Sequence, residues 1–254
     1  VRLTEHHRAI NDAKATTEVF LHMLKRLKKE GINRFQDINL LIDPKEVYKY
    51  PYPKHINLLV KKQEGLKNLY KILSQALTMY YDRDGKILKT VLDKYRKGLL
   101  VSSGCRNSAF FEIAMTKTRK ELKKAAAYYD FLEVQPPSTF SYLKESMPEW
   151  QNVIQDVIRR IVEVGRELNI PVCATGDCHH LDPEDKKYRE IMINTPLVGG
   201  GFHQLHGESE KPSQHFFTTQ EMLDEFSFLG DDIADEIVVK NTNMIADSID
   251  EIII

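Results

Sequence analysis

The stretch PEWQNVIQDVIRRIVEVGRELNIPVCATGDCHH, residues 148–180, decides the fold class of this chain. Its first part places apolar residues at i, i+3, i+4, i+7, i+8 and i+11, which is the stripe of an amphipathic helix. These residues are Trp150, Val153, Ile154, Val157, Ile158 and Ile161. Residues 171–175 then form a short apolar run that is typical of a buried strand. The stretch therefore predicts a helix over 148–168 followed by a strand.

The same alternation of helix and strand extends through the rest of the chain. We expect strands at 55–60, 99–102, 131–135 and 171–175, and helices at 4–30, 65–80, 107–129, 148–168, from Thr218 onward and at 232–249. Such alternation favours a parallel sheet or barrel with helices packed outside it. The prediction is an α/β fold. Residues 31–52 lose the helical periodicity and contain prolines, so we interpret them as a linker.

Composition sets limits on what the chain does. It has 254 residues, of which 42% are hydrophobic and 29% charged, so it can bury an ordinary core. The formal net charge of −1 excludes a protein that grips DNA by bulk charge, so any nucleic-acid contact must be local. No apolar run approaches the ~20 residues of a membrane span. We therefore expect no membrane partner. Three cysteines are too few for a disulfide scaffold, which favours a cytoplasmic protein with reduced thiols.

Both ends of the sequence look cut from a longer chain. The sequence starts at Val1 and runs at once into a helical pattern, and it stops at an apolar run that ends at Ile254. We therefore expect further segments on either side.

A first candidate site lies at the start of the first helix, where residues 7–12 read His-x-Ala-x-x-Asp. His7 and Asp12 are five residues apart, about 140° around an ideal helix, so they converge only if the first turn is unwound. A solvated helix start is the alternative interpretation, and the spacing leaves it open.

Two further candidates follow predicted strands. Asp177 and His179 alternate on an extended segment, so both side chains can point to one metal ion; an ordinary loop is the alternative. Cys105 follows a strand and the turn at Gly104, where it is either a metal ligand or a small buried residue. His55 stands at the start of a strand, where a packed histidine is the alternative to a ligand.

Other polar residues are not promoted to site residues. Glu133 sits between apolar neighbours in a strand and is expected to face away from the core or into the mouth of a barrel. His203, His206 and His215 lie in or beside the Gly-rich loop 196–216 with irregular spacing. We interpret that loop as solvated.

Together the motifs resemble the PolC-type DNA polymerase III alpha subunit family over nearly the whole chain. The resemblance rests on His-x-x-Leu-Leu-x-Lys-x-x-x-Gly-Leu-Lys-Asn-Leu at 55–69, Tyr-Arg-x-Gly-Leu-Leu at 95–100 leading to Cys105, Tyr-Asp-Phe-Leu-Glu-Val-Gln-Pro-Pro at 129–137, and Ala-Thr-Gly-Asp-x-His at 174–179. It closes with Phe-Thr-Thr-x-Glu-Met-Leu at 217–223. The first helix separately resembles the third motif of DEDDh-type 3′–5′ proofreading exonucleases.

The resemblance implies a domain plan and a function. Residues 1–30 would be the C-terminal helix of an exonuclease, 31–52 a linker, 53–195 the later part of a PHP (polymerase and histidinol phosphatase) domain, 196–216 a Gly-rich loop and 217–254 helices leading toward a polymerase core. The fold would be part of a distorted β/α barrel of PHP type preceded by the exonuclease helix. DNA, deoxynucleotides and other replisome subunits would be partners of the parent polymerase.

The resemblance also implies the roles of the candidate residues. His7 would be the base that activates water and Asp12 a ligand of Mg or Mn in the exonuclease. His55, Cys105, Asp177 and His179 would hold Zn, Mn or Fe in the PHP site. The family's early His-x-His motif and its other exonuclease carboxylates lie outside this sequence, so the fragment alone is expected to be inactive. A free-standing PHP phosphoesterase and a non-catalytic metal-stabilised scaffold are the alternatives.

Overall fold

A computed structural model describes residues 9–41, 46, 49, 51–82 and 84–254 of the chain. The chain divides into two compact units, Val1–Tyr52 and Pro53–Ile254, which we describe separately. In the first unit, α1 (Ala9–Lys29) is followed by a 3-10 helix, Phe35–Leu41. The left-handed Gly31 follows the end of α1, as a glycine C-cap requires. Apolar side chains of α1, including Phe20 and Met23, are about half exposed.

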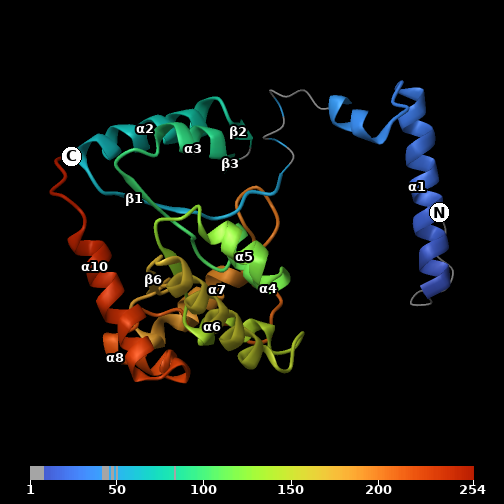
Figure 1. The fold of residues 1–254 in the computed structure, drawn as a ribbon. Coiled ribbons are helices and arrows are strands. Elements are labelled where there is room, and N and C mark those ends of the chain that lie inside the picture. The colour runs from blue at the N-terminus through green and yellow to red at the C-terminus, as the bar shows by residue number, and fades with distance from the viewer. Residues whose placement is uncertain (1–8, 42–45, 47–48, 50, 83) are drawn as a thin grey trace. The chain divides into compact units, whose positions relative to one another are not determined.

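Two pairs of short strands lie within the helices of the second unit (Figure 1). β1 (Asn57–Val60) pairs with β4 (Leu99–Ser102), and β5 (Leu132–Val134) pairs with β6 (Val172–Ala174). A single parallel bridge between Ser102 and Phe131 connects the two pairs. The minor strands β2 (Tyr81–Asp82) and β3 (Asp84–Gly85) form a separate hairpin.

The predicted parallel sheet is correct only in part. β5 and β6 are parallel, as the intervening helix requires, but β1 and β4 are antiparallel. The described strands form two-stranded sheets, so a mixed, mostly helical α/β fold is present and a closed barrel is not shown. The alternation pattern could not reveal this because it shows the order of elements but not strand direction. The single helix predicted at 232–249 is interrupted by a π-helical turn over Glu236–Lys240.

The main core lies beneath α6 (Trp150–Leu168), whose buried residues include Ile154, Val157, Ile158 and Ile161. The predicted apolar stripe is therefore confirmed. The helix ends at Asn169, which has the left-handed φ of 53° of a C-cap residue and turns the chain into β6. α4 (Ala109–Thr116) and α5 (Arg119–Ala126) pack against α6, and a 3-10 helix, Pro137–Leu143, connects β5 to it.

A smaller core lies between β1, β4 and the helices α2 (Gln63–Thr78) and α3 (Lys89–Tyr95). The N-terminal turn of α2 packs directly on backbone, because a Cβ on Gly65 would lie 1.9 Å from the Gly98 carbonyl oxygen. The sequence predicted α2 and β4 but not α3, whose seven residues are too few for a clear periodicity.

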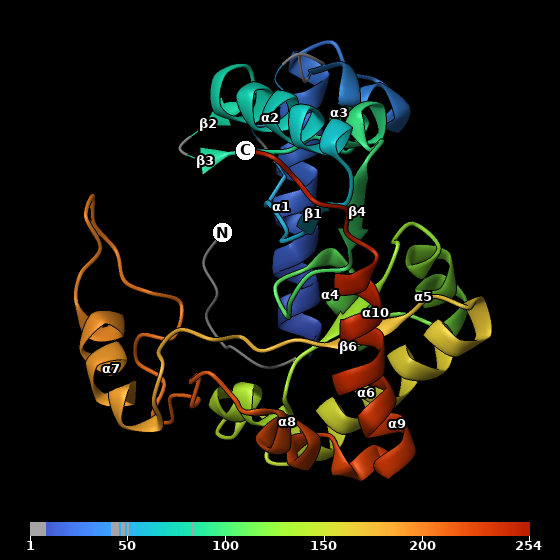
Figure 2. The same cartoon turned by 90° about the vertical axis from the view of Figure 1, so that its left-hand side faces the viewer.

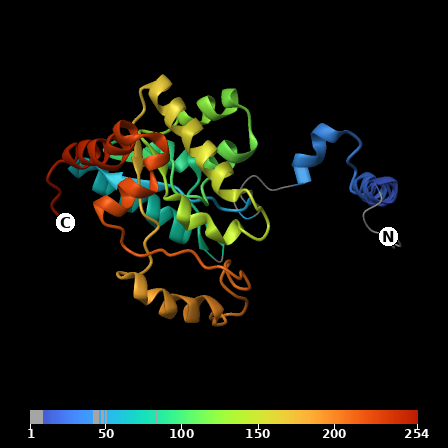
Figure 3. The same ribbon diagram turned by 90° about the horizontal axis from the view of Figure 1, so that it is seen from below.

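The last part of the chain contains α7 (Lys186–Asn194), α8 (Thr219–Glu225), α9 (Asp231–Asp235), a π-helical turn over Glu236–Lys240 and α10 (Asn241–Asp247). α7 stands apart from α6 at one side of the second unit (Figures 2 and 3). The end of the chain returns to the start of α2, where Gln63 exchanges two hydrogen bonds with the backbone of Ile253.

Candidate functional site

The first pair of candidate donors comes from the chain before β1 and the turn after β4. The His55 Nδ1 atom lies 3.2 Å from the Cys105 Sγ atom, although fifty residues separate them. Backbone contacts hold this pair together. The His55 amide donates to the Asn107 carbonyl, and a Cβ on Gly104 would lie 3.1 Å from the His55 carbonyl oxygen. The tight turn that carries Cys105 therefore requires a glycine with its φ of +73°.

The second pair follows β6. The His179 Nε2 atom lies 3.2 Å from the Asp177 Oδ1 atom, and the Asp177 side chain is 19% exposed. The segment leaves the sheet at the carboxyl end of a parallel strand, where α/β proteins commonly place functional groups. The alternation that suggested the pair is confirmed, because both side chains reach the same place.

A residue from the following loop holds this second pair. Gln214 is fully buried, and its side-chain amide donates to the Asp177 Oδ2 atom over 2.7 Å. Its backbone carbonyl accepts from the His179 amide over 2.7 Å, and its side-chain oxygen accepts from Arg189. Nothing in the sequence pattern pointed to Gln214, because it lies at the end of the loop that we interpreted as solvated.

Arg106 connects the two pairs. It follows Cys105 in the chain, and its Nε atom lies 3.6 Å from the Asp177 Oδ2 atom, with only 5% of its side chain exposed. Burial raises the pKa of the Cys105 thiol, and the charge of Asp177 contributes to this rise. Burial also lowers the pKa of His179, and the positive charge of Arg189 lowers it further. The cysteine and the histidine therefore both favour their neutral forms.

The donor chemistry of each pair fits a transition metal. Two ligands of one tetrahedral zinc ion are ~3.4–3.6 Å apart, given metal–ligand bonds of about 2.0–2.3 Å. Both observed separations of 3.2 Å are close to that value. Within the described residues, no group of three or more His, Cys, Asp or Glu side chains is placed to hold one ion. Each pair could supply half of a ligand set.

The exonuclease candidates lie in the first unit. His7 falls outside the described residues. Asp12 lies in the first turn of α1 and is half-buried, and its backbone carbonyl accepts a hydrogen bond from the Thr16 hydroxyl.

Of the two positions expected for Glu133, the one facing solvent is wrong, and the one in the mouth of a barrel stays a prediction. Glu133 is 6% exposed, and its carboxylate accepts hydrogen bonds from Asn57, Ser102 and Thr175. Cys173 is buried, with 2% of its surface exposed. Both residues line a cleft of about 560 Å³ that lies between α10 and the strands β1, β5 and β6. The short strand pattern around Glu133 could not show that three neighbouring segments supply donors to it.

The three loop histidines have contacts of their own. The His215 ring bonds to Ser213 and to Glu221, and His206 stacks on Phe202. His203 accepts from the Leu205 amide. These contacts explain their positions through packing and hydrogen bonds.

Comparison with known proteins places the chain in a family. Residues 1–136, more than half of the chain, match the PHP domain family. The chain therefore belongs to the PHP domain family, and the resemblance found in its motifs is confirmed.

The whole chain is also homologous to DNA polymerase III of PolC type. It is 41% identical to the "DNA polymerase III PolC-type" of Staphylococcus saprophyticus over 258 aligned residues and 41% identical to that of Staphylococcus haemolyticus over 259. The protein of the same name from Staphylococcus aureus is 39% identical over 259 residues. Each alignment covers 100% of this chain and 17% of the relative, so the chain corresponds to about a sixth of these polymerases. Among the described residues, no helix combines the length and apolar character that a membrane crossing needs.

Proposed function

We propose that this chain is a region of a bacterial replicative DNA polymerase of PolC type, which extends primers with deoxynucleotides and proofreads in the cytoplasm. The observation that carries the proposal is that the alignment to polymerases of this name covers the entire chain. In this proposal DNA and other replisome subunits are partners of the longer protein.

The chain's part in that protein is to supply two half-sites. His55, Cys105, Asp177 and His179 would be ligands of zinc, manganese or iron in the PHP domain. The two pairs, each with donor atoms 3.2 Å apart, and the contact from Arg106 to Asp177 support this assignment. A metal bound there would neutralise charge on phosphate oxygens and lower the pKa of a bound water. The remaining ligands would come from segments outside the given sequence.

The first unit would belong to the proofreading exonuclease, with 31–52 as the linker. This assignment rests on the His-x-Ala-x-x-Asp motif, in which His7 removes a proton from water and Asp12 binds Mg or Mn. Hydrolysis of a phosphodiester needs both an activated water and charge stabilisation at the oxygens.

Metal analysis tests the PHP assignment. The purified polymerase should carry zinc, manganese or iron, measured by elemental mass spectrometry, and the Asp177→Ala/His179→Ala variant should lose it. The matched control is Asp224→Ala/His206→Ala, which removes the same residue types from other parts of the second unit and should keep the metal. Equal metal content in all three proteins would contradict the assignment of these ligands.

Nuclease assays test the exonuclease assignment. In the full-length polymerase, His7→Ala and Asp12→Ala should each lower 3′–5′ excision by about 100-fold or more. Primer extension should be unchanged. Excision that survives both substitutions would show that the motif is a solvated helix start.

A further inference from the structure

Positive charge is concentrated in one part of the second unit. Residues 61–97 contain ten lysines and arginines and four acidic residues, which gives +6 for this segment. Since the whole chain has a net charge of −1, the remaining residues together carry −7. A polyanion is therefore attracted to the α2–α3 segment and repelled by the rest.

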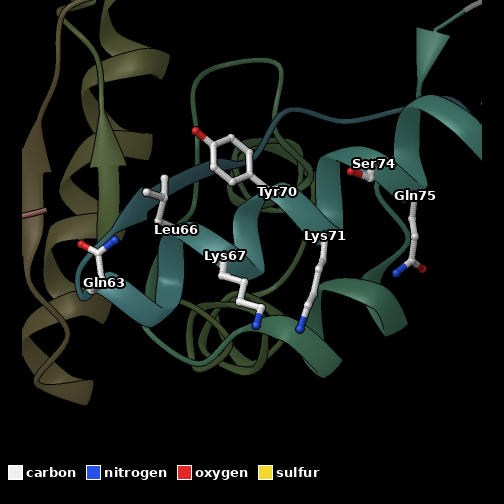
Figure 4. Close-up of a pocket in the computed structure, with 7 residues that line it drawn as sticks. All are labelled: Gln63, Leu66, Lys67, Tyr70, Lys71, Ser74 and Gln75. Atoms are coloured by element: carbon white, nitrogen blue, oxygen red, sulfur yellow. The ribbon is translucent and has the colours of Figure 1, made fainter. Parts of the chain in front are cut away.

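Two lysines of this segment, Lys71 and Lys94, lie over one aromatic ring, and a third, Lys67, lies nearby on α2. The ammonium groups of Lys71 on α2 and Lys94 on α3 lie 5.2 and 5.1 Å from the centre of the Tyr95 ring. Lys67 precedes Lys71 by one helical turn, and Figure 4 shows both side chains extending in the same direction from α2. Like charges at this spacing destabilise a helix slightly, so an anionic partner would relieve the repulsion.

These lysines have no carboxylate of their own. Within the described residues, Lys67, Lys71 and Lys94 form no ion pair, whereas the neighbouring Lys89 and Lys97 pair with Asp93 and Glu64. A hydrogen bond from the Lys94 ammonium group to the Tyr95 hydroxyl, together with the charges of Lys94 and Lys71, lowers the pKa of that hydroxyl. The cluster therefore offers three lysines whose charges no carboxylate neutralises within the described residues.

Aromatic and apolar surface lies beside the cluster. Lys67 and Lys71 line a shallow groove of about 510 Å³ together with Leu66 and Tyr70. Tyr70 is 54% exposed, and in Figure 4 its side chain leaves α2 in the direction opposite to the two lysines, so that it borders the groove from the other edge. Single-stranded nucleic acid binds to such surfaces because lysines contact the phosphates and exposed rings stack on bases. An acidic protein segment would use the lysines but would not need the open ring.

We infer that the α2–α3 surface formed by Lys67, Tyr70, Lys71, Lys94 and Tyr95 binds the phosphate backbone of a single nucleic-acid strand. Nothing in this binding requires the candidate metal site, which is formed by other segments. The contact would not depend on the base sequence, and it would hold the nucleic-acid strand against the α2–α3 surface.

Fluorescence anisotropy with a labelled oligothymidylate of about 16 nucleotides tests the inference. The chain should bind in the presence of EDTA, and its affinity should fall as salt rises. Lys67→Glu/Lys71→Glu should weaken binding by about tenfold or more, and Tyr70→Ala by about fivefold or more. Because both lysines are exposed, circular dichroism should show an unchanged fold.

The matched control is Lys120→Glu/Lys124→Glu on α5, which makes the same charge change at the same spacing on another exposed helix face. This variant should bind like the parent. The inference is overturned by three results: no binding at low salt, an equal loss in the control, or binding of polyglutamate to the α2–α3 surface without binding of the oligonucleotide. The use of EDTA keeps a failure here separate from a failure of the metal assignment.

Discussion

The two donor pairs of the second unit are held in different ways. Among the described residues, backbone alone holds the His55–Cys105 pair, through the Asn107 carbonyl and the close approach of Gly104 to the His55 backbone before β1. The Asp177–His179 pair also depends on side chains: the fully buried Gln214 amide and Arg106 contact the Asp177 carboxylate, in addition to the backbone bond from His179 to Gln214. Substitutions should therefore affect the first pair through steric clash and the second through lost hydrogen bonds.

The largest expected contrast is in thiol reactivity. Burial, together with the charge of Glu133, raises the pKa of Cys173 on β6 to about 12, so at pH 8 roughly one molecule in ten thousand carries its thiolate. Cys178, four residues beyond β6, is exposed. A short pulse of iodoacetamide followed by peptide mapping should label Cys178 and spare Cys173. The half-buried Cys105 should be labelled to an intermediate extent.

The same pulse in concentrated urea should label all three cysteines, which serves as the control. Because the folded state raises the pKa of Cys173, its contribution to stability is complete below pH ~8.5 and declines as the pH rises toward 12. Fast native labelling of Cys173 would contradict its position in the core.

Gly104→Ala should cost about 2–3 kcal/mol of unfolding free energy. The substitution adds a Cβ in a left-handed conformation, and this Cβ meets the His55 backbone at 3.1 Å. Gly201→Ala is the matched control, because Gly201 also has a positive φ but nothing lies within 4 Å of its Cβ position. Urea denaturation should give a smaller loss of about 1 kcal/mol for the control. Equal losses of unfolding free energy in the two variants would show that the Gly104 backbone contact does not hold the His55–Cys105 pair.

Gln214→Leu should cost about 1–3 kcal/mol, since it leaves the partly buried Asp177 carboxylate without its amide donor. Gln220→Leu removes the exposed amide that donates to Asp224 on α8 and should change stability by less than about 0.5 kcal/mol. Metal affinity, measured by calorimetry, should also fall in the Gln214 variant alone, by about tenfold or more. A Gln214 variant that matches the control in both measurements would refute the role of the side chain.

The smallest loss of stability is expected for substitutions of Thr218, the N-cap residue of α8. Thr218 and Glu221 form a capping box at the start of α8, where the sequence predicted that a helix begins. Thr218→Ala should lower stability by about 1 kcal/mol, while Thr218→Ser should be nearly neutral because it keeps the hydroxyl. Thermal unfolding measures both. A loss with serine as large as with alanine would assign the effect to the methyl group.

The sequence predicted the features that depend on local pattern. The stripe of α6, the limits of β4 and the cap of α8 follow from periodicity and from single residues such as Thr218. The turn at Gly104 was also visible, as was the alternation of Asp177 and His179.

The remaining features depend on contacts between distant segments. The antiparallel pairing of β1 with β4, the contact of Gln214 with Asp177 and the three donors around Glu133 join residues that are 31 to 76 positions apart. No local pattern records which distant partner a residue meets. The motif resemblance named the donors, but the residues that orient them became visible only in three dimensions.

The two hydrogen bonds between Gln63 and Ile253 join positions 190 residues apart. On a ribosome that adds about 5–20 residues per second, Gln63 would emerge roughly 10–40 s before its partner. The first turn of α2 must therefore fold without this contact. The extended segment 250–254 is then the last to attach, and its amides should exchange with solvent hydrogen earlier than those of α6.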